Sequence, residues 1–97
     1  MVTRSHDMWV EKNNGLEVGL VFKDFLEAFG FMQQVADLAE AHGHHPEWFN
    51  VYNRLDIRLS THDAGNIVTE KDRELAAAIS QLPGFSGALQ GGLQRTV

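Results

Sequence analysis

The spacing of hydrophobic residues changes near residue 22, and this change constrains the fold more than any other feature of the chain. Hydrophobic side chains occupy every second position over residues 16–22, which predicts a half-buried strand. Beyond this point they recur at steps of three and four as far as Ala39, which predicts one face of a helix. The sequence Asn-Asn-Gly at residues 13–15 is a strong hairpin signal, so we expect a partner strand over residues 8–12.

The predicted helix runs from about residue 24 to residue 42. Asp24 is its expected N-cap, and Glu27 follows three residues later in a capping-box pattern. Gly43 is the expected C-terminal cap. Gly30 lies inside the helix, where glycine costs about 1 kcal/mol relative to alanine. We therefore expect Gly30 to allow close packing against the sheet.

A second alternating run covers residues 49–59 and is long for one strand. It is either one bent strand or a hairpin, because Asn53 and Arg54 favour a turn. For a hairpin we prefer a three-residue loop or a bulge, since that loop pairs Val51 with Leu55 rather than with a charged residue. On this parity Trp48 points away from the face that the helices cover.

Thr69 is the expected N-cap of a second helix that ends before Pro83, and Asp72 lies three residues after the cap. The tail beyond carries four glycines among residues 84–92, and it either packs on a neighbour or is partly disordered. The element order predicts an α+β fold, with a four-stranded antiparallel sheet and helices packed on one face. We expect one domain over residues 1–97, with its core at 8–82 and a C-terminal extension at 83–97.

Composition excludes several classes of protein. The net charge of −5 and the scattered basic residues argue against nucleic acid as a partner. The absence of cysteine excludes disulfides, thiolate catalysis and cysteine-based zinc sites. No apolar run approaches the roughly 18 residues that span a membrane, and the N-terminus lacks the apolar core of a signal peptide. We expect a cytoplasmic protein with no membrane partner.

The segment from Glu40 to Asp72 carries four of the five histidines, at positions 42, 44, 45 and 62. Imidazole titrates near pH 6.5, so clustered histidines provide acids and bases at about neutral pH. We interpret this group as functional, although any one of them alone is more readily an ordinary surface or satisfied histidine. Trp48 is either a core aromatic or a surface for stacking a flat heterocycle. We interpret Asp72 first as a residue that starts the second helix. The second interpretation is that Asp72 orients His62 across the loop.

A metal site is the alternative reading of the same group. His42, His44, His45, His62 and Asp63 supply enough nitrogen and oxygen ligands for zinc. Adjacent histidines in an extended backbone are a poor ligand pair, because their side chains diverge. We therefore place acid–base chemistry ahead of metal binding.

The motif E-x-x-x-H-H-P-E-W-x-x-x-Y at residues 40–52 is followed by T-H-D at 61–63 and by T-x-x-D at 69–72. This pattern resembles the pterin-4a-carbinolamine dehydratase family over about residues 8–82. The family fold is a four-stranded antiparallel sheet with helices on one face. Three features depart from the family: only eight residues precede Trp9, the tail after Leu82 is longer, and position 43 is glycine.

The resemblance implies an enzyme that removes water from a 4a-hydroxytetrahydropterin and so recycles a tetrahydropterin cofactor. It implies that His44 and His62 are general acids on opposite sides of the ring, and that His45 binds the pterin and acts as a base. The implied substrate-binding residues are Glu40, Trp48, Thr61 and Asp63. No cofactor and no metal is implied.

The resemblance also implies partners. The substrate would be released by an aromatic amino acid hydroxylase. We expect self-association into a homodimer or homotetramer, since a chain this short leaves sheet edges open. The alternative function is a protein-interaction role on the same fold, as a transcriptional coactivator or an enzyme assembly factor.

Overall fold

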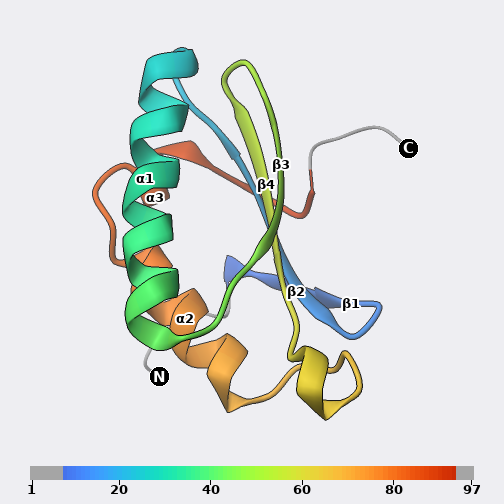
Figure 1. The fold of residues 1–97 in the computed structure, drawn as a ribbon. Helices are drawn as coiled ribbons and strands as arrows, with labels where there is room; N and C mark the ends of the chain where they lie inside the picture. The colour runs from blue at the N-terminus through green and yellow to red at the C-terminus, as the bar shows by residue number, and fades with distance from the viewer. Residues whose placement is uncertain (1–7, 94–97) are drawn as a thin grey trace, which may run out of the picture.

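The computed structural model describes residues 8–93 and has helices on one side of an antiparallel sheet (Figure 1). Residues 94–97 of the predicted extension lie outside the described part. The elements follow in the order β1 (Val10–Lys12), β2 (Gly15–Val21), α1 (Phe25–His42), β3 (Glu47–Val51), β4 (Arg54–Leu59), the 3-10 helix η2 (His62–Ala64), α2 (Glu70–Ser80), α3 (Phe85–Ala88) and β5 (Leu89–Gly91).

The strand order is β1-β2-β4-β3, and every neighbouring pair is antiparallel. The predicted α+β architecture is confirmed. The sheet has five strands rather than four, because β5 pairs with Gly19 and Leu20 of β2. These two residues lie beyond the stretch of β2 that pairs with β1, so the short strands β1 and β5 follow one another along β2.

The first hairpin is confirmed. Lys12 pairs with Gly15, and Asn13 and Asn14 between them have φ angles of 52° and 63°. Asparagine adopts such left-handed angles more readily than other non-glycine residues, so the sequence specifies this turn locally.

Helix α1 begins and ends where the caps predict. Asp24 accepts a hydrogen bond from the Glu27 amide at 2.9 Å, and Gly43 ends the helix with φ of 60°. The expected packing role of Gly30 is wrong, since a Cβ added there meets no heavy atom within 4 Å.

The β3–β4 hairpin has a two-residue loop, Tyr52-Asn53, which pairs Val51 with Arg54. Both the preferred three-residue loop and the single bent strand are therefore wrong. Long-range contacts hold this register: the Phe22 backbone amide donates to the Asn53 carbonyl at 2.8 Å, and the Asn53 side-chain Nδ2 donates to the Phe22 carbonyl at 2.9 Å.

This register also reverses the predicted direction of Trp48. Trp48 lies opposite the buried Ile57, and opposite residues of an antiparallel pair point to the same face. Trp48 therefore points to the helix side of the sheet, although 39% of its surface is exposed at the edge strand. Phe49 lies opposite Asp56 and points to the open face.

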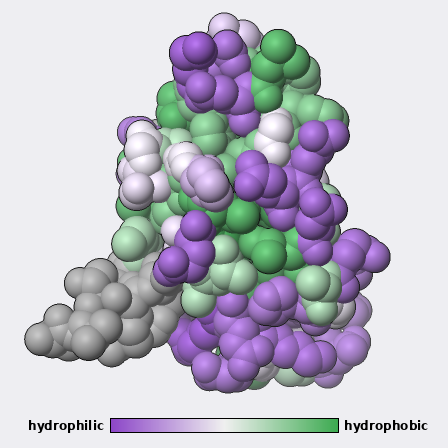
Figure 2. Space-filling model, turned by 90° about the vertical axis from the view of Figure 1, so that its left-hand side faces the viewer, coloured by the Kyte–Doolittle hydropathy of each residue, from purple (hydrophilic) through white to green (hydrophobic). Residues whose placement is uncertain are grey.

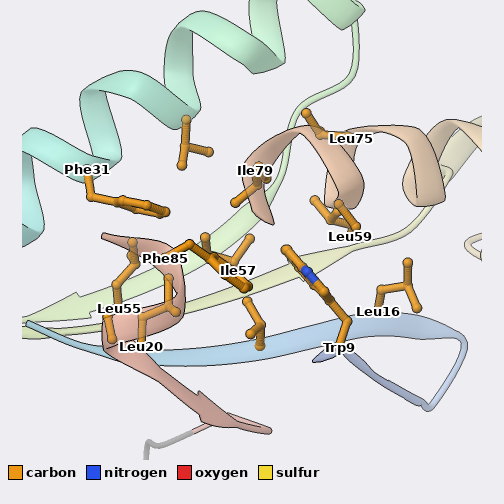
Figure 3. Close-up of a cluster of buried hydrophobic side chains, with 14 of the residues drawn as sticks. Trp9, Leu16, Leu20, Phe31, Leu55, Ile57, Leu59, Leu75, Ile79 and Phe85 are labelled. Carbon is orange, nitrogen blue, oxygen red and sulfur yellow. The ribbon is translucent and has the colours of Figure 1, made fainter. Parts of the chain in front are cut away.

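The hydrophobic core lies between the sheet and the helices and includes part of the tail (Figure 3). Phe85 is fully buried, with ring centroids 6.3 Å from Trp9 and 6.5 Å from Phe31. The Trp9 indole also donates to the Ser80 hydroxyl at 2.9 Å. Within residues 8–93, no helix has the length and apolar composition needed to cross a membrane.

Candidate active site

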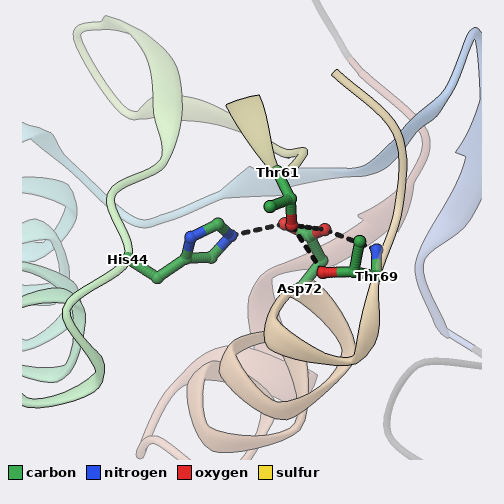
Figure 4. Close-up of polar contacts among 4 residues, drawn as sticks. All are labelled: His44, Thr61, Thr69 and Asp72. Atoms are coloured by element: carbon green, nitrogen blue, oxygen red, sulfur yellow. Dashed lines mark hydrogen bonds and ion pairs between the residues drawn. The ribbon is translucent and has the colours of Figure 1, made fainter. Parts of the chain in front are cut away.

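Four elements meet at one end of the sheet: the loop after α1, the end of β4, η2 and the first turn of α2 (Figures 1 and 4). The left-handed cap at Gly43 turns the chain back on itself, so that the His44 amide donates to the Ala39 carbonyl at 3.0 Å. This turn directs the His44 side chain toward Thr61 and Asp72 (Figure 4). Residues distant in the sequence are thereby brought together.

Asp72 is the centre of a buried polar network. Its carboxylate has no exposed surface and accepts from His44 Nε2 at 2.6 Å, from the Thr61 hydroxyl at 2.7 Å and from the Thr69 amide at 2.8 Å. The bond to the Thr69 amide belongs to the capping box of α2. One side chain therefore both begins a helix and holds His44, whose side chain is 11% exposed. Asp72 therefore orients His44, and the predicted option that it orients His62 is wrong.

The hydrogens of this network can be assigned from its partners. An ionised carboxylate only accepts, so His44 carries its hydrogen on Nε2 and Thr61 donates its hydroxyl hydrogen to Asp72. The Thr61 oxygen lies 2.6 Å from the Thr69 hydroxyl, which must then be the donor. The nitrogen of His44 that remains outside this network is Nδ1.

His45 and His62 are held differently, by exposed partners. His45 Nε2 lies 2.6 Å from Glu40 Oε2, in a pair whose side chains are 66% and 78% exposed. Such a solvent-exposed pair contributes little to stability. His62 Nδ1 lies 3.0 Å from Asn66 Oδ1, across the turn that follows η2.

The three histidines line one cavity of about 250 Å³, whose full lining is Gly43, His44, His45, Ser60, Thr61, His62, Asp63 and Lys71. Five of the seven predicted site residues are therefore brought together here. Glu40 reaches the cavity through its bond to His45. Trp48, three residues beyond His45, is not part of the lining.

Sequence reasoning missed Ser60, Lys71 and Asn66. Lys71 adjoins Asp72, and Ser60 adjoins Thr61, so proximity in sequence to predicted residues was an available signal. For Asn66 the available signal was its residue type, because asparagine is common at left-handed positions in turns.

A larger cavity of about 610 Å³ lies on the open face of the sheet, and Arg58 in its lining pairs with both of the glutamates there. Arg58 contacts Glu17 at 3.2 Å and Glu47 at 3.9 Å, and it also donates to the Asn13 carbonyl. These pairs occupy both carboxylates of the cavity, and no histidine is among the described residues that line it. The smaller histidine cavity is the better candidate active site.

Within residues 8–93, no group of three or more histidine, aspartate or glutamate side chains has the arrangement of a metal site.

The fold and the cavity define a small α+β protein with three histidines around one cavity. The sequence matches the family model described as "Pterin 4 alpha carbinolamine dehydratase" over residues 2–82. The chain belongs to this family of dehydratases, as its central motif predicted.

Curated relatives agree with this assignment. A protein of Solibacter usitatus, named as a candidate pterin-4-alpha-carbinolamine dehydratase, is 54% identical over 79 residues, which cover 81% of this chain and 82% of the relative. A protein of the same name from Burkholderia lata is 56% identical over 72 residues, covering 74% of this chain and 70% of the relative.

A solved structure from Brucella melitensis, described as a transcriptional coactivator/pterin dehydratase, superposes with a TM-score of 0.70 at 47% identity. The superposition covers 75% of this chain and 79% of the Brucella chain. The likeness supports the same fold for both chains.

Proposed function

We propose that this chain converts a 4a-hydroxytetrahydropterin to the quinonoid dihydropterin by loss of water. The observation that carries the proposal is the convergence of His44, His45 and His62 on one cavity in a member of this family. In the reaction the C4a–O bond breaks, the hydroxyl leaves as water after it gains a proton, and N5 loses its proton. Both proton transfers suit imidazole near neutral pH.

His44 and His62 are the proposed general acids. Asp72 holds the Nε2 hydrogen of His44, so His44 acts as an acid in its protonated form and delivers the proton on Nδ1. His62 is held through its Nδ1 hydrogen, so it takes up a proton on Nε2 and delivers that proton to the substrate. The two rings come from different elements, the loop after α1 and η2, which suits transfer on two sides of a flat substrate.

His45 is the proposed base and pterin ligand, and Glu40 holds its ring. Asp63 lines the same cavity and is a proposed hydrogen-bond acceptor for the substrate. The Thr61 hydroxyl is committed to Asp72, so we assign Thr61 mainly to support of His44. Contact between Trp48 and the pterin stays a prediction, and Trp48→Ala should raise KM if it is right.

The test is an assay of carbinolamine dehydration with purified protein. His44→Ala and His62→Ala should each lower turnover about 10²-fold or more, as expected for a lost general acid. His45→Ala should also raise KM. His42→Ala is the matched control, because His42 is exposed at the end of α1 and does not line the cavity. Unchanged kinetics in the His44/His62 double variant would remove both residues from the mechanism.

The proposed mechanism uses no metal and no organic cofactor. Activity should therefore survive EDTA, and loss with EDTA that zinc restores would overturn it. The proposed metabolic role is tetrahydropterin recycling, in which an aromatic amino acid hydroxylase releases the substrate. Addition of the chain to such a hydroxylase should speed disappearance of the 4a-hydroxy intermediate.

A protein-interaction role is the second candidate, and exposed hydrophobic side chains on α1 favour it. Phe25 and Phe29 are each 44% exposed with their rings stacked 6.0 Å apart, and Leu26 is 78% exposed. Figure 2 shows hydrophobic patches among polar ones on the α1 side of the molecule. A second copy of the chain is the simplest occupant. Phe25→Lys with Phe29→Lys should weaken self-association and leave dehydration unchanged if the two functions are separate.

A further inference from the structure

The turn from Thr61 to Ile67 holds Asn66 in a fixed backbone position. The Thr61 amide donates to the Ile67 carbonyl at 2.8 Å, and the Asn66 amide donates to the Thr61 carbonyl at 3.0 Å. Gly65 and Asn66 both have left-handed backbones, with φ of 91° and 61°. Asparagine is one of the few side-chain-bearing residues that adopt this conformation at low cost. The turn therefore fixes the Asn66 backbone four residues after His62, from where its side chain reaches the ring.

That side chain contacts a ring that the proposed reaction uses. Asn66 Oδ1 lies 3.0 Å from His62 Nδ1. An amide oxygen only accepts a hydrogen bond, so the hydrogen of the neutral ring is on Nδ1 and the lone pair is on Nε2. If the amide were turned over, its NH₂ would donate to Nδ1 and the hydrogen would move to Nε2. The two arrangements give opposite tautomers.

We propose that Asn66 is a positioning residue that sets the tautomer of His62 and directs Nε2 into the cavity, where this nitrogen takes up the proton that the ring then delivers as an acid. The inference rests on the proposed role of His62 in the dehydration. His44 and His62 then present different nitrogens, one held by a buried carboxylate and the other by a neutral amide. A neutral partner leaves the charge of the His62 ring uncompensated when the ring takes up a proton. The other titratable groups that line the cavity are His44, His45, Asp63 and Lys71.

Two variants at position 66 separate backbone from side chain. Asn66→Gly keeps the left-handed backbone and removes the amide. Asn66→Asp keeps an acceptor beside Nδ1 and adds a negative charge, which favours the protonated ring and moves its titration to higher pH. The tautomer is read from ¹⁵N chemical shifts of labelled histidine in the full chain without substrate, above the pH at which the ring titrates.

We expect the hydrogen of His62 on Nδ1 in the unmodified chain and in Asn66→Asp, and a mixture of tautomers in Asn66→Gly. Turnover of Asn66→Gly should fall about 3- to 10-fold with little change in KM, the factor expected for one exposed hydrogen bond. Asn66→Asp should restore turnover at the optimum and shift the pH–rate profile upward. In a His62→Ala background, Asn66→Gly should cause no further loss, since the two residues act as a unit.

An unchanged His62 tautomer in Asn66→Gly, or an equal loss of turnover in the His62→Ala background, would overturn the inference. A hydrogen found on Nε2 in the unmodified chain would show the amide to be reversed and would also overturn it. A tautomer that responds to substitution in a chain with no dehydratase activity would instead reject the proposed function. The two failures are therefore distinguishable.

Discussion

Replacement of Asp72 by asparagine tests the network that holds His44. The carboxylate is fully buried and accepts from His44, Thr61 and Thr69 at 2.6–2.8 Å. Asparagine has nearly the same shape, but its amide nitrogen is a donor, so it faces at least one other donor. We expect the His44 ring to change tautomer, so that Nε2 accepts from the new amide and Nδ1 carries the hydrogen.

The size of the effect follows from the three bonds. A hydrogen bond to a charged group contributes about 1.5–3 kcal/mol, against about 0.5–1.5 kcal/mol between neutral groups. In Asp72→Asn the bonds from Thr61 and Thr69 persist but end on a neutral oxygen. The bond to His44 forms again with the asparagine amide as the donor. All three bonds lose the charged acceptor, at about 1–1.5 kcal/mol each, so the free energy of unfolding should fall by about 3–4.5 kcal/mol.

Urea unfolding measures this loss, and ¹⁵N shifts of labelled histidine report the tautomer of His44. Asp63→Asn is the matched control, because Asp63 is exposed and has no hydrogen bond or ion pair with any residue in the described part of the chain. Its effect should stay within about 0.5 kcal/mol. An unfolding free energy unchanged in Asp72→Asn, or an equal loss in both variants, would refute the assignment of the network.

Three further outcomes are expected. Gly30→Ala should raise the free energy of unfolding by about 0.5–1 kcal/mol in urea titrations, because a Cβ fits the open space there. Gly43→Ala, at a left-handed cap, is the control and should lower the free energy of unfolding. A lower free energy of unfolding in Gly30→Ala would contradict the open space at that position. Phe85→Ala should cost about 3–5 kcal/mol in the same titrations, and a small cost would show that the tail covers little. Sedimentation should give at least a dimer at micromolar concentration, which Phe49→Lys with Val51→Lys on the edge strand β3 should weaken; a monomeric unmodified chain contradicts self-association.

The sequence predicted those parts of the fold that local chemistry specifies. The turn at Asn13 and Asn14 requires positive φ, which asparagine tolerates, and the caps at Asp24 and Gly43 use side-chain and backbone preferences that act within a few residues. The capping box at Thr69 and Asp72 is of the same kind. Such features can be predicted because no distant residue competes with them.

The register of β3 and β4 could not be predicted in this way. Tyr52, with φ of 54°, gives no local signal for a left-handed turn, and the hydrophobic alternation continues through the loop. The two hydrogen bonds between Asn53 and Phe22 join residues 31 positions apart, so they form only when β2 is in place. The burial of Phe85 could not be predicted either, because the glycines around it in the sequence are typical of a loop rather than of a core segment.

In the candidate site, too, some features were predictable from local sequence and others depended on the tertiary fold. Its histidines were predictable from type and spacing, but the partner of each depended on how the chain returns. Asp72 begins α2 as predicted, but the optional role of orienting His62 is wrong, because the loop between β4 and α2 offers no sequence measure of direction. The structure pairs Asp72 with His44, 28 positions away, and leaves His62 to Asn66 within its own turn.

These different supports predict which variants separate chemistry from stability. His44 depends on Asp72, and Asp72 also begins α2 inside the core, so any change there alters folding and the proposed catalysis together. His45 and His62 depend on Glu40 and Asn66, whose bonds are exposed and local. Exposed pairs contribute little to the free energy of unfolding but still orient a ring. Variants at Glu40 and Asn66 are therefore the ones in which a loss of turnover can be assigned to the orientation of a histidine rather than to loss of the fold.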